Sequence, residues 1–302
     1  MRTTVLFFSA ILVLPSCGKD TPDSDGASAE YRYRLGLAIS MDTTTPFFTS
    51  LLEGAEESAL RLNADVITLS AGEDASLQSE QILELAGLGV DVLLLNPVSD
   101  AVVPALEAVS AMNIPVLTID RSVHSESVVC HIASNNRAGG KMAGDYLAES
   151  LHRSGRVVEI RGTPGSSAAI ERGHGFRDAM ESFPAIEIVV SFDADFSRAQ
   201  ARDRFAEILE EHSSIDAVFA HNDEMILGAA QAARQAGRSD ILFVGFDAID
   251  EAVTAVEEGR LLATVAQKPA EMGRLGVETA VQFLSGRPVP DSITVDLALI
   301  IR

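Results

Sequence analysis

Asp120 and Arg121 are the adjacent pair of residues in this sequence with the clearest capacity for ligand chemistry. They directly follow residues 116–119, a short and mostly apolar run that is typical of a strand buried on both faces, and Pro115 disfavours a helix there. Open parallel sheets bind ligands at the carboxyl ends of their strands. A carboxylate beside a guanidinium with five donors suits a ligand that carries adjacent hydroxyl groups. A surface turn with two solvated charges is the alternative for this pair taken alone.

Other polar side chains recur where predicted strands end, in both halves of the chain. With the first pair, they form the set Asn96, Asp120, Arg121, Arg172, Asn222, Asp247 and Gln267. Phe47, Phe48 and Phe196 lie in loops at the same ends. Each residue alone could be a helix cap, a surface group or part of the core. Together they suit a sugar, whose hydroxyls pair with polar side chains and whose C–H faces stack on aromatic rings.

The elements that must position these residues alternate regularly along the chain. Short apolar runs predict strands at 33–40, 66–69, 92–95, 116–119, 128–133, 157–160, 186–190, 217–220, 241–244 and 263–266, with a final strand near 293–301. Segments with the apolar spacing of a helix lie between these strands. They include residues 46–62, 76–88, 102–112, 138–151, 199–210 and 271–284. This alternation predicts an α/β protein with parallel sheets, built from two similar Rossmann-like halves.

Composition narrows the class of function. The chain has 302 residues and is 47% hydrophobic, which is enough for two domains with sizeable cores. Its 44 acidic and 23 basic side chains give a net charge of -21. Nucleic-acid binding needs a basic face, and binding to anionic lipid needs a basic patch, so both are disfavoured.

A Rossmann-type enzyme remains an alternative, with little to support it. The Gly-rich turn at 162–167 lacks the dinucleotide fingerprint, and neither Asp247 nor His221 has a visible partner as a lone base. Cys130 and His131 are neighbours on a predicted strand, so their side chains point to opposite faces and cannot act on one atom. We expect no catalysis, no cofactor and no bound metal.

The N-terminal residues have the features of an export signal. Arg2 precedes an apolar run at 5–14 that is too short to span a bilayer as a helix. Leu14-Pro15-Ser16-Cys17 resembles a bacterial lipobox, which predicts a signal peptide at 1–17 and lipidation of Cys17, although Pro15 is unusual in that pattern. An ordinary signal with a bystander cysteine is the alternative. Residues 18–32 are predicted to be a flexible tether, since they are rich in Asp, Ser, Gly and Ala.

Eight short motifs, in order, carry a family resemblance. They are PFF (46–48), IDR (119–121), HIAS (131–134), GGK (139–141), ERG (171–173), NDEM (222–225), VGFD (244–247) and AQ (266–267). From about residue 35 to residue 302 the chain resembles the type I periplasmic sugar-binding proteins of ABC importers, and within them the D-ribose branch.

The resemblance implies two lobes with a sugar between them, joined by three crossovers near Ser134, Gln267 and Asp296. The first lobe would comprise 33–134 with 268–295, and the second 135–267 with 296–302. The implied ligand contacts are Phe47, Phe48, Asp120 and Arg121 from the first lobe, and Arg172, Phe196, Asn222, Asp247 and Gln267 from the second lobe and hinge. Asn96 would support the site from nearby.

Residue 45 departs from the family pattern. The family places an Asn that contacts the sugar before Pro-Phe-Phe, whereas this chain has Thr45 in a loop that is one residue longer. Thr is shorter and stiff at χ1, and Pro46 restricts it to extended conformations. We therefore expect water or Asp42 to take over that contact, and D-ribose to bind with less discrimination against related sugars.

The resemblance also implies partners and location. An ABC permease in the inner membrane is the expected partner, a chemotaxis receptor is a further candidate, and the protein is expected to be a monomer. It would be lipid-anchored in the periplasm or on the outer face of the cytoplasmic membrane. Another pentose, a hexose such as allose, or a polyol are alternative ligands, and a sugar sensor without a transport role is an alternative function. A repressor with this sensor fold would need a DNA-binding segment where the export signal stands.

Overall fold

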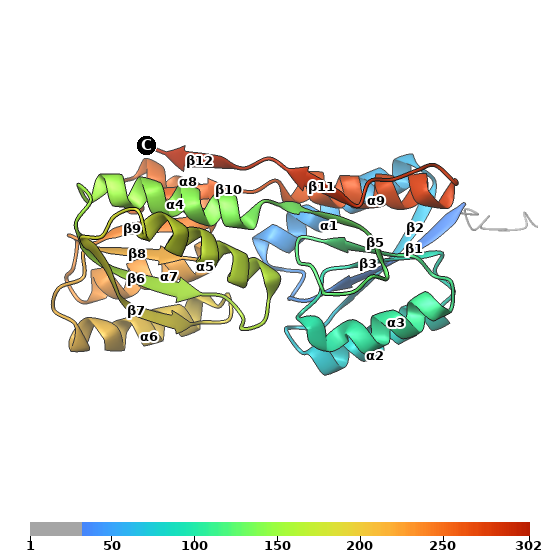
Figure 1. Cartoon of the computed structure of the whole chain (residues 1–302), viewed down its shortest axis with the longest axis horizontal. Helices are drawn as coiled ribbons and strands as arrows, with labels where there is room; N and C mark the ends of the chain where they lie inside the picture. The colour runs from blue at the N-terminus through green and yellow to red at the C-terminus, as the bar shows by residue number, and fades with distance from the viewer. Residues whose placement is uncertain (1–31) are drawn as a thin grey trace, which may run out of the picture. The chain divides into compact units, whose positions relative to one another are not determined.

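The computed structural model describes residues 32–302. The predicted signal peptide, the predicted lipidation site Cys17 and the predicted tether up to residue 31 lie outside the described residues. Two six-stranded sheets, each covered by helices on both faces, organise this part of the chain (Figure 1). We call each sheet with its helices a lobe. The predicted α/β class with two doubly wound halves is confirmed.

The first lobe contains a fully parallel sheet with strand order β11-β5-β4-β3-β1-β2. Its strands are β1 (Tyr33–Ile39), β2 (Ala64–Ser70), β3 (Val92–Leu95), β4 (Val116–Ile119), β5 (Val128–Ser134) and β11 (Ser292–Val295). One face packs on α1 (Pro46–Arg61) and α9 (Pro269–Leu284). The other face packs on α2 (Ala75–Gly87), the short 3-10 helix η1 (Asp100–Val102) and α3 (Val103–Ala111).

The second lobe repeats this plan with order β12-β10-β9-β8-β6-β7, in which only β12 is antiparallel. Its strands are β6 (Gly155–Arg161), β7 (Ile186–Asp193), β8 (Ala217–Ala220), β9 (Leu242–Asp247), β10 (Ala263–Ala266) and β12 (Ala298–Ile301). Helices α4 (Asn136–Ser150) and α5 (Ser167–Met180) cover one face. Helices α6 (Arg198–Glu211), α7 (Asp223–Gln235) and α8 (Asp250–Glu257) cover the other.

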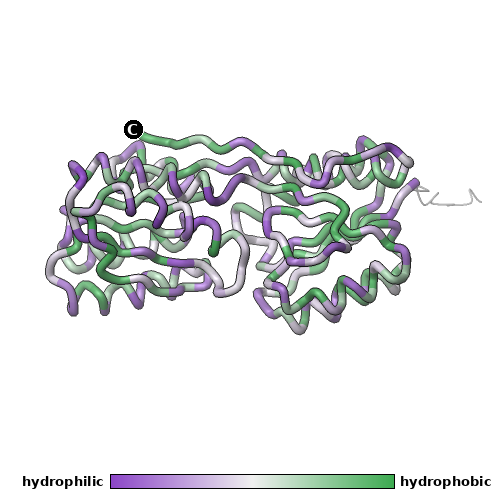
Figure 2. The backbone as a smooth tube through the Cα atoms, in the orientation of Figure 1, coloured by the Kyte–Doolittle hydropathy of each residue, from purple (hydrophilic) through white to green (hydrophobic). Residues whose placement is uncertain are grey.

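Three strands inside the sheets are short and buried on both faces. Strands β3, β4 and β8 are buried at every position, which matches their nearly continuous apolar sequences. Figure 2 shows the hydrophobic colour concentrated on the strands inside each lobe. Polar side chains such as Asn96, Asp120 and Asn222 follow these three strands, where the loops begin.

The structure differs from the predicted elements at two places. The single final strand expected near 293–301 is two strands, β11 and β12, which belong to different sheets. The break falls at Asp296 and Leu297, between the two pairings. Helix α8 was not predicted, because an eight-residue helix offers only two turns of periodic signal.

The chain passes between the two sheets three times. It leaves the first sheet after Ser134, returns to the first lobe after Ala266, and passes to the second sheet again between Val295 and Ala298. Within residues 32–302, every helix is too short or too polar to cross a bilayer.

Candidate ligand-binding site

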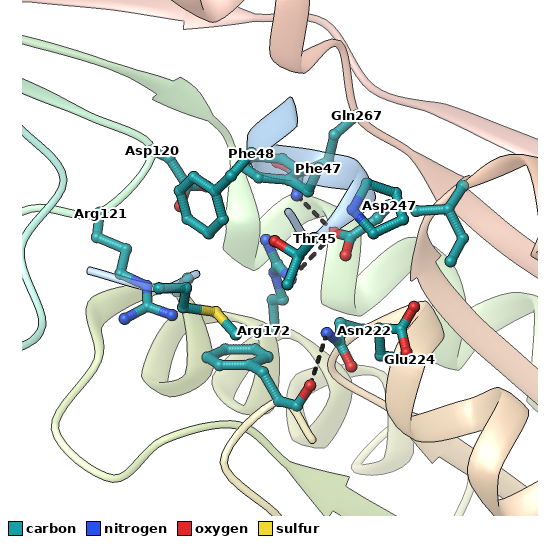
Figure 3. A pocket seen from close by; sticks show the side chains of 15 residues that line it. Thr45, Phe47, Phe48, Asp120, Arg121, Arg172, Asn222, Glu224, Asp247 and Gln267 are labelled. Carbon is teal, nitrogen blue, oxygen red and sulfur yellow. Dashed lines mark hydrogen bonds and ion pairs between the residues drawn. The ribbon is translucent and has the colours of Figure 1, made fainter. Parts of the chain in front are cut away.

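One pocket collects residues from the ends of strands in both lobes (Figure 3). Of the predicted site residues, those lining it are Thr45, Phe47, Phe48, Asp120, Arg121, Arg172, Phe196, Asn222, Asp247 and Gln267. Met41, Pro46, Ala168, Glu224 and Ile249 line it as well. The parallel arrangement explains this convergence, because the carboxyl ends of all the strands in such a sheet lie along one edge.

Arg172 is fixed in place by contacts on several sides. Its Nε donates to Asn136 Oδ1 at 2.8 Å and its Nη1 donates to the carbonyl of His221 at 2.6 Å. The guanidinium carbon lies 3.9 Å from the centre of the Phe246 ring. Burial lowers the pKa of Arg172, and Asp247 at 3.5 Å opposes that shift. The side chain is therefore a rigid, charged donor at the floor of the pocket.

Asp247 is the pocket carboxylate whose pKa is shifted most. Burial raises the pKa of Asp247 to about 7, against the opposing effects of Arg172 and of the amide of Gln267, which donates to Oδ1 at 2.8 Å. Asp223 lies behind it and accepts from Thr264 Oγ1 at 2.7 Å and from the backbone N–H of Ile249 at 3.0 Å. Burial and the charge of Asp247 raise the pKa of Asp223 as well.

Asp120 is held from behind by Asn96. The Asn96 amide donates to Asp120 Oδ2 and to the carbonyl of Ile119, both at 3.0 Å, while its own Oδ1 accepts from the Ser40 hydroxyl at 2.5 Å. Asn96 is fully buried and does not line the pocket, and it contacts the site through Asp120. Asp120 adopts φ 63°, an uncommon left-handed conformation at the end of β4.

Two buried oxygens of the site accept no hydrogen bond from any described residue. They are Oδ1 of Asp120 and Oε1 of Gln267, and their side chains both line the pocket. Buried polar atoms in proteins are nearly always hydrogen-bonded. A ligand that supplies hydroxyl donors at these two points fits the pocket chemically.

The aromatic side chains supply apolar faces. The rings of Phe47 and Phe48 meet edge to face with centroids 5.1 Å apart, and both line the pocket. Phe196 comes from the second lobe, and its ring centre lies 5.0 Å from the guanidinium carbon of Arg121 in the first lobe. The carbonyl of Phe196 accepts a hydrogen bond from Asn222 Nδ2, and Asn222 Oδ1 caps α7 by accepting from Met225 N.

Thr45 lines the pocket, but its hydroxyl is directed to its own loop. Oγ1 donates to the carbonyl of Asp42 at 3.0 Å. The Asp42 carboxylate accepts from the backbone N–H and hydroxyl of Thr44, both at 2.8 Å, and Asp42 does not line the pocket. Of the two substitutes predicted for the missing contact, water and Asp42, Asp42 does not reach the pocket in this structure, because its side chain closes a local turn instead.

Several lining residues were missed by the sequence reasoning. Met41 packs against the apolar cores of both lobes, and Ala168 and Ile249 are small or aliphatic residues without a chemical signature. Glu224 lines the pocket next to Asn222, and Arg198 neutralises it through a forked pair of 2.7 and 3.1 Å. The NDEM motif at 222–225 was the only available signal for Glu224.

The other candidate chemical groups do not lie in this pocket. His221 is fully buried, its Nε2 faces Glu159 Oε1 at 3.2 Å, and burial lowers its pKa. Cys130 lies in the core of the first lobe, where burial raises its pKa to about 11, while His131 contacts Thr118 through Nδ1 at 2.8 Å. Neither pair is arranged for nucleophilic or acid–base chemistry on a bound molecule.

Comparison with known proteins identifies the family to which this chain belongs. The family model of the periplasmic binding protein domain matches residues 37–288. This chain belongs to that family of solute-binding proteins, which is a binding class rather than an enzyme class.

Individual proteins are similar to this chain over nearly its whole length. The chain is 39% identical over 277 residues to the ribose import binding protein RbsB of Escherichia coli, covering 91% of this chain and 93% of that protein. It is 36% identical over 300 residues to RbsB of Bacillus subtilis, covering 98% and 97%. Among solved structures, the fructose-binding periplasmic domain of a hybrid two-component system superposes with a TM-score of 0.86 at 32% identity, covering 89% of this chain and 91% of that one.

Proposed function

We propose that this protein is the extracytoplasmic binding component of an ABC sugar importer and that its ligand is a neutral monosaccharide. The observation that carries this proposal is the pair of buried acceptors, Asp120 Oδ1 and Gln267 Oε1, in a pocket that also holds fixed arginine donors and aromatic rings. Acceptors, donors and apolar faces at close quarters match the alternating hydroxyls and C–H faces of a sugar. An inner-membrane permease would be the partner that receives it.

D-Ribose is the first candidate ligand. Both the Escherichia coli and the Bacillus subtilis relatives are ribose import binding proteins, and each covers more than nine-tenths of this chain. A hexose is the second candidate. It is favoured by the fructose-binding domain of similar fold and by Thr45, whose hydroxyl is occupied within its own loop.

We further propose that the protein is tethered to a membrane by lipidation of Cys17. The support is the lipobox-like run 14–17 after an apolar segment, followed by a polar stretch that suits a tether. A chemotaxis receptor as an additional partner stays a proposal from the family resemblance alone.

Titration calorimetry tests the binding function directly. We expect D-ribose to bind the purified wild-type domain without being converted to a product. A buried hydrogen bond to a charged group contributes roughly 1.5–3 kcal/mol, so Asp120→Ala and Arg172→Ala should each weaken affinity by about tenfold or more.

Lys141→Ala is a matched control, because Lys141 is an exposed cation paired with Asp145 on α4 and does not line the pocket. We expect its affinity to equal that of the wild type. Unchanged affinity in both pocket variants would refute the assigned site. Turnover of the sugar would refute the assignment to a binding class.

A further inference from the structure

Arg121 is engaged by a carboxylate that belongs to no part of the predicted site. Its Nη2 donates to Glu73 Oε1 at 2.9 Å and its Nη1 donates to Glu73 Oε2 at 3.3 Å. The Arg121 side chain is 3% exposed and the Glu73 side chain 19%, so water screens this pair only in part. Glu73 thus occupies the two terminal nitrogens of an arginine that lines the ligand pocket.

Glu73 is held at this point by its backbone. It lies in the loop between β2 and α2 with φ 67°, a conformation that few non-glycine residues adopt. Its N–H donates to the carbonyl of Ser40 at 2.6 Å, which ties the loop to the end of β1. The next residue, Asp74, caps α2 by accepting from the backbone N–H groups of Ser76 and Leu77. Hydrogen bonds therefore hold the backbone at Glu73 and at Asp74. The carboxylate of Glu73 contacts Arg121 from a backbone position that is already fixed.

The hydrogen bonds to Glu73 limit which ligands Arg121 can bind. An arginine with free terminal nitrogens binds a carboxylate or phosphate through two parallel hydrogen bonds, and these are among the strongest contacts in proteins. In Arg121 the Glu73 carboxylate already makes that forked contact. Phe196 lies over the guanidinium from the second lobe. An anionic ligand would have to compete with Glu73 for the same donors.

The second pocket arginine is neutralised as well. Arg172 lies 3.5 Å from Asp247, and two of its nitrogens donate to Asn136 and to the His221 carbonyl. Each arginine is thus matched by a carboxylate, which leaves Asp120 as an additional negative group facing the ligand. An anionic ligand would meet this charge in a partly desolvated pocket, where like charges repel more strongly than in water.

We propose that Glu73 is a specificity-determining residue that restricts the pocket to neutral hydroxylated ligands and rejects sugar acids and sugar phosphates. Rejection arises from a repulsive group placed behind the arginine, and a neutral sugar meets no such charge repulsion. This inference rests on the proposed function, because it concerns which members of the sugar class the same pocket accepts.

The test compares D-ribose with D-ribonate in the wild type and in Glu73→Gln. Glutamine keeps the shape of the side chain and removes its charge. We expect the ratio of the ribonate to the ribose dissociation constant to fall by about tenfold or more in Glu73→Gln, and the gained ribonate affinity to decrease with added salt. The two ligands differ in shape, but this difference affects the ratio of dissociation constants equally in the wild type and in the variant. Glu73→Ala provides a second variant, for which the same direction is expected.

Glu84→Gln is the matched control, since Glu84 is exposed on α2 and its substitution changes the net charge by the same amount. Its ratio should equal that of the wild type. If Glu73 merely positions Arg121, Glu73→Gln will weaken both ligands in proportion, and the unchanged ratio will overturn the inference. Wild-type protein that binds ribonate as tightly as ribose would overturn it too. Absence of any neutral-sugar binding in the wild type would instead refute the proposed function.

Discussion

At Asp247, burial works against a nearby arginine, and the result is a carboxyl group that titrates close to neutral pH. Its pKa of about 7 in the ligand-free protein is raised by desolvation and by the charges of Asp120 and Glu224, and is lowered by Arg172 and Gln267. The pKa of the neighbouring Asp223 is raised as well, so the two carboxyl groups titrate as an interacting pair.

This shift makes ligand binding dependent on pH. A sugar hydroxyl that donates to Asp247 favours the carboxylate, so the pKa in the complex lies below that of the free protein. Binding then releases a proton, and affinity should rise as the pH increases from 5 to 8 and level off above that. We expect Asp247→Asn to bind more weakly and to lose most of this dependence. Calorimetry in buffers of different ionisation enthalpy measures both effects, and a wild-type affinity that falls with rising pH would contradict the sign.

Thr45 concerns selectivity among sugars. Its hydroxyl donates to the Asp42 carbonyl, whereas an asparagine amide has a longer reach and offers both a donor and an acceptor. Thr45→Asn should shift preference towards D-ribose over xylose, arabinose, allose and ribitol by about 1 kcal/mol, the size of one hydrogen bond. A competition titration across these ligands checks the ranking. If the order is the same in both proteins, the loop 41–45 does not set specificity.

At the scale of elements, glycines allow the helices that carry the site to pack backbone against backbone. A Cβ at Gly140 on α4 would lie 2.1 Å from the carbonyl oxygen of Arg172 on α5, and one at Gly175 would lie 1.9 Å from the carbonyl oxygen of Arg137. Helix α4 begins directly after the chain leaves the first sheet. The crossing of α4 and α5 therefore positions Arg172 relative to the chain passage at Ser134.

Gly140→Ala should affect stability and binding together. Overpacking of this kind costs typically about 1–3 kcal/mol, and the displaced backbone belongs to Arg172 itself. We expect a lower free energy of unfolding in denaturant titration and weaker sugar affinity. Gly87→Ala on α2 is the control, because no atom lies within 4 Å of its added Cβ and alanine favours a helix by up to about 1 kcal/mol. Normal affinity in Gly140→Ala would show that Arg172 is not held through α4.

At the scale of the whole molecule, the site is incomplete in either lobe alone. Asp120 and Arg121 come from the first lobe, and Arg172 and Asn222 from the second. The backbone N–H of Ser122 also donates to Ser167 Oγ at 2.8 Å across the two lobes. The relative placement of the lobes is therefore part of the binding chemistry, and the three chain passages constrain it.

The proposed tether is a prediction at the same scale. Cys17→Ser should move the protein from the membrane fraction to the soluble fraction or stall its processing. The physical reason is that a group with several acyl chains anchors stably, whereas a single chain binds only marginally. Fractionation followed by immunoblotting measures the distribution. A wild-type protein that is already soluble would show that Cys17 is not lipidated.

The sequence by itself determined the fold class and predicted most of the residues that the structure gathers in one pocket. Runs such as VLLL at 92–95 and AVFA at 217–220 predict strands buried on both faces, and their regular alternation with helices predicts parallel sheets. Once the sheets are parallel, residues after the strands must gather at one edge, which is why Asp120, Asn222 and Asp247 were predicted together.

Only the tertiary structure decided which of these side chains face the ligand and which act from behind. Asn96 follows a strand as Asp120 does, yet Ser40 and Asp120 engage it in the interior. Glu73 follows a strand that ends in an ordinary polar loop, and its contact with Arg121, which lies 48 residues away in sequence, depends on a left-handed backbone conformation. Local sequence patterns report burial and chain direction. They do not report the rotamers and non-local hydrogen bonds that assign each polar group its partner, because those depend on how separate elements pack.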